Sequence, residues 1–174
     1  MTVTSRISLR IEGLRTIASA GGIPELDLPY QAALAAVLAD GDSLDEADEV
    51  WFGVFGIAAG ESTTFDLQSL QQRDPTGATI RTVSFDEIKA GAIVETSDSD
   101  TGGTLTIGNA TSDAWAGTSC LLDDATYTKS IESGDGRFWT SRNGATVDAT
   151  HKNLKLAAAD QVCSGYVMLI GVAS

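Results

Sequence analysis

The side chains that could perform chemistry are few, and their spacing fits no common catalytic pattern. His151 is the single histidine, and Cys120 and Cys163 are the two cysteines. Hydrolysis by a serine nucleophile needs a histidine beside a serine and an acid, and no Gly-x-Ser-x-Gly motif marks such a serine. A zinc site needs more cysteine and histidine ligands at short spacing. The sequence therefore predicts no catalytic residue, no metal ligand and no bound cofactor, and we expect that the protein is not an enzyme.

Acidic residues are concentrated in loops, most densely from Asp40 to Asp48. If Asp40 held the first position of a calcium-binding EF-hand loop, the sixth position would be Asp45 instead of glycine and the twelfth would be Trp51 instead of glutamate. We interpret the stretch as a solvated connection, because aspartate is common in surface turns. A cation shared between subunits through such loops, among them Asp123-Asp124, is the alternative.

The length and the charge of the chain set bounds on its fold and partners. A chain of 174 residues is long enough for one domain with a hydrophobic core. With 24 acidic and 11 basic residues its formal net charge is −13, which disfavours binding to nucleic-acid phosphates and to anionic membranes. No apolar run is long enough to span a bilayer, and the first residues lack the apolar core of a signal peptide. We therefore expect the protein to stay in the cytoplasm where it is made, with both cysteines reduced and unpaired; a late disulfide between them is the alternative.

The N-terminal region predicts one strand and one helix. Residues 3–11 alternate between apolar and polar types, with Val3, Ile7 and Leu9 on the same side, as in a strand with one solvated face. From Pro29 to Ala39, apolar residues at helical spacing and several alanines predict a short helix that packs against a sheet.

After Glu49 almost every signal is that of a short β-strand bounded by turns. The sequence Ser133-Gly134-Asp135-Gly136 is typical of a hairpin turn, and Tyr166–Val172 is apolar throughout, as in a strand buried on both faces. The sequence thus predicts an all-β protein, an antiparallel β-sandwich of the jelly-roll kind with one short helix near residues 29–39. We expect residues 1–28 to form an N-terminal strand or arm and residues 29–174 to form the sandwich domain.

Three tryptophans are the largest side chains in a chain with few aromatic residues. Trp51 lies in an apolar strand and is expected in the core. Trp115 lies in a polar, glycine-containing segment and is expected to anchor an interface or a loop. The full set of candidate interface residues is Val3, Ile7, Leu9, Trp115, Tyr166 and Met168.

The order of elements and turns from about residue 30 onward resembles a family of small structural proteins of tailed-bacteriophage particles. The resemblance rests on turn chemistry and on no catalytic signature. The residues that carry it are Gly41–Trp51, Gly60–Leu67, Asp74–Ile80, Val83–Ala90, Thr104–Gly108, Leu154–Leu156 and Tyr166–Gly171. The family often has a Pro-Gly-Gly turn before its late strands, and this chain has Glu132–Gly136 there, without the proline.

The resemblance implies a structural protein of the virion. We expect a capsid decoration, or cement, protein that binds the outer shell in symmetric copies and stabilises it, with the major capsid protein and its own copies, as a homotrimer, for partners. It would assemble in the host cytoplasm and end on the capsid exterior, without contact to nucleic acid or membrane. The alternative is a head-fibre, neck or tail component that binds host-surface glycans through Trp115 and the Ser97–Gly103 loop.

Overall fold

A computed structural model of the chain describes residues 5–17, 26–38, 41–42, 46–73, 77–97, 102–116 and 121–173. All the regular structure in these ranges is β-strand, and all the pairings between named strands are antiparallel. The predicted all-β, antiparallel and sandwich-like fold is therefore confirmed. Among the described residues there is no helix, and hence none that could cross a membrane.

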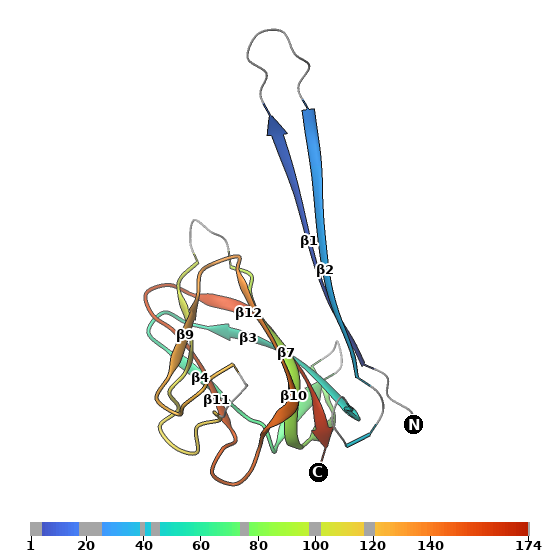
Figure 1. Ribbon diagram of the computed structural model, residues 1–174. Helices are drawn as coiled ribbons and strands as arrows, with labels where there is room; N and C mark the ends of the chain where they lie inside the picture. Colours follow the sequence, from blue (N-terminus) through green and yellow to red (C-terminus); the bar gives the residue numbers. More distant parts are fainter. Residues whose placement is uncertain are drawn as a thin grey trace.

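Eight strands form two four-stranded sheets (Figure 1). The first sheet has the order β10-β7-β12-β3, with bounds Gly136–Thr146, Phe85–Glu95, Cys163–Ala173 and Glu49–Ile57. The second has the order β4-β11-β8-β9, with bounds Ser62–Asp66, Asn153–Ala158, Leu105–Gly108 and Thr128–Ile131.

The main core contains one face of each sheet. Alternate residues of a strand point to opposite faces, so the buried members of β11 and β12 recur at every second position, as Leu154, Leu156, Val167 and Leu169 do. Large side chains from both sheets fill the core, among them Phe85, Ile93, Leu105, Ile107 and Trp139, together with Trp115 from the segment between β8 and β9. Burial of this apolar surface is the main source of stability for the sandwich.

A small hairpin of β5 (Leu70–Arg73) and β6 (Thr79–Val83) packs beside β3. The guanidinium of Arg81 donates to both carboxylate oxygens of Glu49 at 2.6 Å. The backbone N–H of Phe52 donates to Oε1 of Gln72 at 3.4 Å. These contacts cover part of the outer edge of β3, which would otherwise expose unpaired backbone groups.

The N-terminal strands β1 (Ser5–Ile17) and β2 (Leu26–Leu38) form a long antiparallel ribbon, with Ser5 opposite Leu38 and Ile17 opposite Leu26. In Figure 1 this ribbon, in blue, projects away from the two sheets. The predicted boundary between residues 28 and 29 falls within β2. Residues 1–4, with the candidate Val3, lie outside the described residues.

The prediction of a helix near residues 29–39 was wrong, because β2 occupies this segment up to Leu38. Residues 32–38 are all apolar, so their pattern fits a strand as well as a helix. Pairing with β1 then outweighs the modest helix preference of the alanines. Pro29 is compatible with this position because a two-stranded ribbon leaves one edge of each strand unpaired.

Candidate functional site

His151 lies in an exposed turn. Its Nδ1 is 3.0 Å from Oδ1 of Asp148, and the same oxygen accepts from the backbone N–H and the hydroxyl of Thr150. The hydroxyl and backbone hydrogen bonds from Thr150, with a smaller contribution from His151, lower the pKa of Asp148 to about 2. These are the contacts that close an Asx turn. Among the described residues no three His, Cys, Asp or Glu side chains are grouped so that they could hold a metal ion.

The feature that best fits a functional role is the face of the β10-β7-β12-β3 sheet that points away from the main core. The strand register places its residues in three rows across four strands. None of the twelve residues is charged. The rows are Val54-Tyr166-Val94-Gly136, Phe52-Met168-Ala92-Phe138 and Val50-Ile170-Ala90-Thr140. We call this surface the outer face.

Large apolar side chains of the outer face are open to solvent. Phe52 is 47% exposed, Val54 72%, Phe138 54% and Tyr166 42%. The rings of Phe52 and Tyr166 lie 5.9 Å apart, which shows that the two side chains share one side of the sheet. A contiguous exposed apolar patch of this kind typically marks a site of contact with another molecule.

The chain itself covers one end of the outer face. Ala47 packs with Val50, Ala90 and Ile170 in a small second core. Two hydrogen bonds hold this segment in place: Asp48 N–H donates to the carbonyl of Gly171 at 3.1 Å, and Ala173 N–H donates to Oδ1 of Asp48 at 2.8 Å. The rows of Phe52 and Val54 extend beyond this cover.

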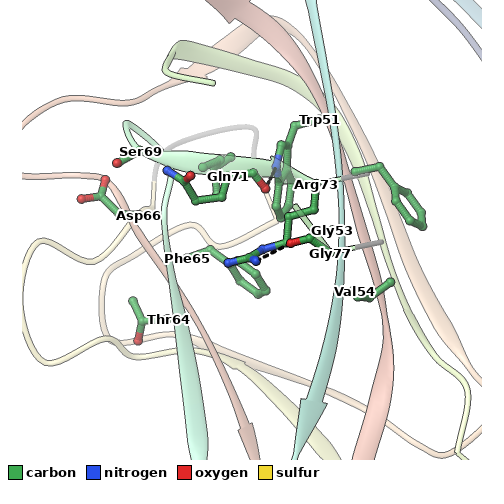
Figure 2. Close-up of a pocket in the computed structure, with 12 residues that line it drawn as sticks. Trp51, Gly53, Val54, Thr64, Phe65, Asp66, Ser69, Gln71, Arg73 and Gly77 are labelled. Carbon is green, nitrogen blue, oxygen red and sulfur yellow. Dashed lines mark hydrogen bonds between the residues drawn. The ribbon is translucent and has the colours of Figure 1, made fainter. Parts of the chain in front are cut away.

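A groove of about 730 Å³ lies where the edge strands β3 and β4 meet the β5–β6 hairpin (Figure 2). Trp51 and Phe65 form its apolar side, with ring centroids 5.5 Å apart in an edge-to-face arrangement. Nε1 of Trp51 donates to the carbonyl of Gln71 at 3.2 Å, and Arg73 donates to the carbonyl of Gly77 at 2.8 Å. Its lining also includes the polar residues Thr64, Asp66 and Ser69.

A buried carboxylate holds the loops at one end of the first sheet. Glu95 is fully buried and accepts hydrogen bonds from the backbone N–H groups of Ser97, Gly134 and Ser164 at 3.0 to 3.2 Å. Burial by itself raises the pKa of Glu95, but hydrogen bonds from these three residues outweigh it and hold the pKa below its ordinary value. The carboxylate therefore ties three separate segments of the chain together.

The candidate interface residues lie in different places. Tyr166 and Met168 are on the outer face, exposed and half-buried respectively. Ile7 and Leu9 are in β1, opposite Ala36 and Leu34 of β2.

Trp115, which we expected to anchor an interface or a loop, is fully buried. Its ring packs 6.2 Å from that of Trp139, because the polar segment around it folds over the core. The predicted glycan site of Trp115 and the Ser97–Gly103 loop therefore lacks an exposed aromatic ring at Trp115, and residues 98–101 of that loop lie outside the described residues.

The acidic loops and the cysteines are described in part. Asp124 closes a surface turn by accepting from the backbone N–H and the hydroxyl of Thr126. Residues 40 and 43–45 of the densest acidic stretch lie outside the described residues, as does Cys120. Cys163 is a buried free thiol, and its burial raises its pKa.

Comparison with known proteins gives no family for this chain. No protein-family model and no curated protein matches it. Among solved structures, a Bacillus endospore appendage protein, from disulfide-linked pili, is 12% identical, with a TM-score of 0.29 over 74% of this chain and 94% of that one.

Proposed function

We propose that this protein is a non-enzymatic structural component of an assembled particle, and specifically a decoration protein on the capsid of a tailed bacteriophage. The observation that carries the proposal is the outer face, where Phe52, Val54, Phe138 and Tyr166 leave an uncharged apolar surface open. When another molecule covers such a surface, the free energy falls because apolar area is removed from water.

We also propose that the sandwich is a jelly roll. In chain order, the eight sandwich strands pair first with last, second with seventh, third with sixth and fourth with fifth: β3 with β12, β4 with β11, β7 with β10 and β8 with β9. This nested pairing is the pattern of a jelly roll, a fold that is common among capsid proteins. The fold therefore supports the proposal that this protein is part of a phage particle, by analogy of fold alone.

The charge distribution fits a place on the outside of a shell. A protein with a net charge of −13 is repelled by packaged nucleic acid and stays soluble at high local concentration. We propose that the copies form homotrimers that contact the major capsid protein. Many copies on one shell gain avidity, so that each contact with the shell can be modest.

The test is to remove the gene from the phage genome and compare purified particles with and without the protein. We expect the protein in purified wild-type particles at a fixed ratio to the major capsid protein. We also expect that particles without it release DNA at a lower temperature, and that adding the purified protein restores the temperature. Particles that never contain the protein would refute the proposal.

A second candidate function is binding of host-surface glycans by a head-fibre, neck or tail component. The groove favours it, because Phe65 offers an apolar surface beside polar side chains such as Thr64, Asp66 and Ser69. A glycan array tests it, with Ser69→Trp as a variant that fills the groove. No bound glycan, or binding that Ser69→Trp leaves unchanged, would exclude this function for the groove.

A further inference from the structure

We infer that the β1–β2 ribbon of one copy packs on the outer face of a second copy of this chain. The inference rests on the proposed function as an assembly protein, and it names the partner of the outer face. It joins two features of the same chain: a ribbon that projects from its own sandwich and an apolar sheet face whose rows of Phe52 and Val54 remain open.

The ribbon needs a surface to pack on. A two-stranded hairpin is marginally stable alone in water, because it has no second layer to bury its apolar residues. In the register of β1 and β2, one alternating set of pairs is apolar at four positions, Ile7 with Ala36, Leu9 with Leu34, Ile11 with Ala32 and Ile17 with Leu26, and also contains Gly13 with Tyr30 and Arg15 with Leu28. Since alternate residues of a strand share a face, this pattern indicates one predominantly apolar face along the ribbon.

Charge favours the ribbon over a second sandwich as the occupant of the outer face. Residues 1–38 contain three arginines and three acidic residues, so their net charge is zero. Residues 39–174 contain eight basic and 21 acidic residues, a net charge of −13. Two sandwiches packed face to face would bring two such charges together, whereas a neutral ribbon with Arg6, Arg10 and Arg15 in β1 carries no such repulsion.

The size of the open face limits what each contact contributes. The two open rows across four strands measure about 13 by 20 Å, or roughly 260 Å². In a closed ring of copies, each copy gives one ribbon and receives another, so it makes two such contacts, each smaller than the roughly 800 Å² per partner of a standard protein interface. A head-to-tail exchange of this kind closes into a ring, such as the proposed trimer.

Disulfide trapping between two full-length chains tests the inference. One chain carries a cysteine in the ribbon, at Leu9→Cys or Ile11→Cys, and the other, distinguished by a tag, carries Val54→Cys on the outer face. The matched controls are Arg10→Cys, at the intervening position of β1, and Ile80→Cys in β6, which is 64% exposed against 72% for Val54. Unsubstituted chains report any background from Cys120 and Cys163.

We expect the mixed disulfide of Leu9→Cys or Ile11→Cys with Val54→Cys to form at least fivefold faster than the disulfides of two control pairs. The control pairs are Arg10→Cys with Val54→Cys, and Leu9→Cys with Ile80→Cys. Trapping only between two Val54→Cys chains would overturn the inference, because it would mean that the outer faces meet each other. A purified protein that stays monomeric and forms no mixed disulfide would also overturn it. Since no phage particle is needed, ribbon exchange without incorporation into particles would refute the proposed function alone.

Discussion

Phe52 of β3 and Tyr166 of β12 lie diagonally across neighbouring strands, with ring centroids 5.9 Å apart and both rings open to solvent. Aromatic pairs at the centre of an apolar surface are common anchors of protein interfaces. A soluble protein with this pair exposed alone would carry a liability for aggregation. We therefore expect the proposed assembly to cover this pair.

The first prediction is that Tyr166→Asp weakens self-association at least tenfold without unfolding the protein. The substitution removes the aromatic ring of Tyr166 from the outer face. It also introduces a carboxylate that must lose its hydration when the interface forms. The measurement is the dissociation constant by sedimentation equilibrium, with circular dichroism to check the fold. Tyr127→Asp is the matched control, because Tyr127 is 55% exposed and lies outside the outer face. Equal dissociation constants for the two variants would contradict the prediction.

A second prediction concerns the inner side of the same sheet. Gly91 lies under the ring of Trp139, and a Cβ added there would overlap that ring. Gly91→Ala should therefore destabilise the fold by about 1–3 kcal/mol, the usual cost of overpacking. Thermal unfolding measures it as a drop of several degrees in Tm. Gly56→Ala is the control, because nothing lies within 4 Å of the position of its added Cβ; equal Tm values for both variants would show that Trp139 moves freely.

The sandwich could be predicted from the sequence because its strands are short and their patterns are local. The β9–β10 turn and the apolar β12 both follow from residue types within a few positions. The first strand of the ribbon was expected from the alternation of residues 3–11, but its second strand could not be predicted, because residues 32–38 are apolar at every position and carry no period. Only the pairing with β1, which lies at a distance in the sequence, decides that this segment is a strand.

The outer face was predicted only in part. Tyr166 and Met168 stood out because β12 is apolar on both sides. Phe52, Val54 and Phe138 were missed, although Phe52 and Val54 alternate with the buried Trp51 and Phe55. Within β3 alone, this alternation is equally consistent with a strand buried on both faces. The register with β12 and β7 is what brings these residues into one surface.

The third prediction is that Glu95→Gln destabilises the protein most at neutral pH. The carboxylate of Glu95 accepts three backbone hydrogen bonds, and replacing charged acceptors with an amide should cost about 1.5–3 kcal/mol. Because its pKa is lowered in the folded state, this stabilisation is fully present above the unfolded pKa of about 4.3 and is lost as the pH falls through the folded value. The difference in Tm between wild type and variant should therefore shrink between pH 7 and pH 3.

The control for this pH effect is Glu61→Gln, since Glu61 is an exposed carboxylate. It should leave Tm almost unchanged at both pH values. A gap between wild type and Glu95→Gln that stays constant down to pH 3 would mean that ionisation of Glu95 does not stabilise the fold.

The last prediction separates a core role from an interface role for Trp115. The side chain is fully buried against Trp139, and its Nε1 has no hydrogen-bond partner among the described residues. Trp115→Phe therefore removes volume but breaks no hydrogen bond, and it should cost about 1–3 kcal/mol, below the 3–5 kcal/mol typical of Trp→Ala. Chemical denaturation should show this loss, while the dissociation constant of the oligomer stays at the wild-type value. The opposite result, an unchanged unfolding curve with at least tenfold weaker self-association, would place Trp115 in the interface and would require a conformation in which its ring is exposed.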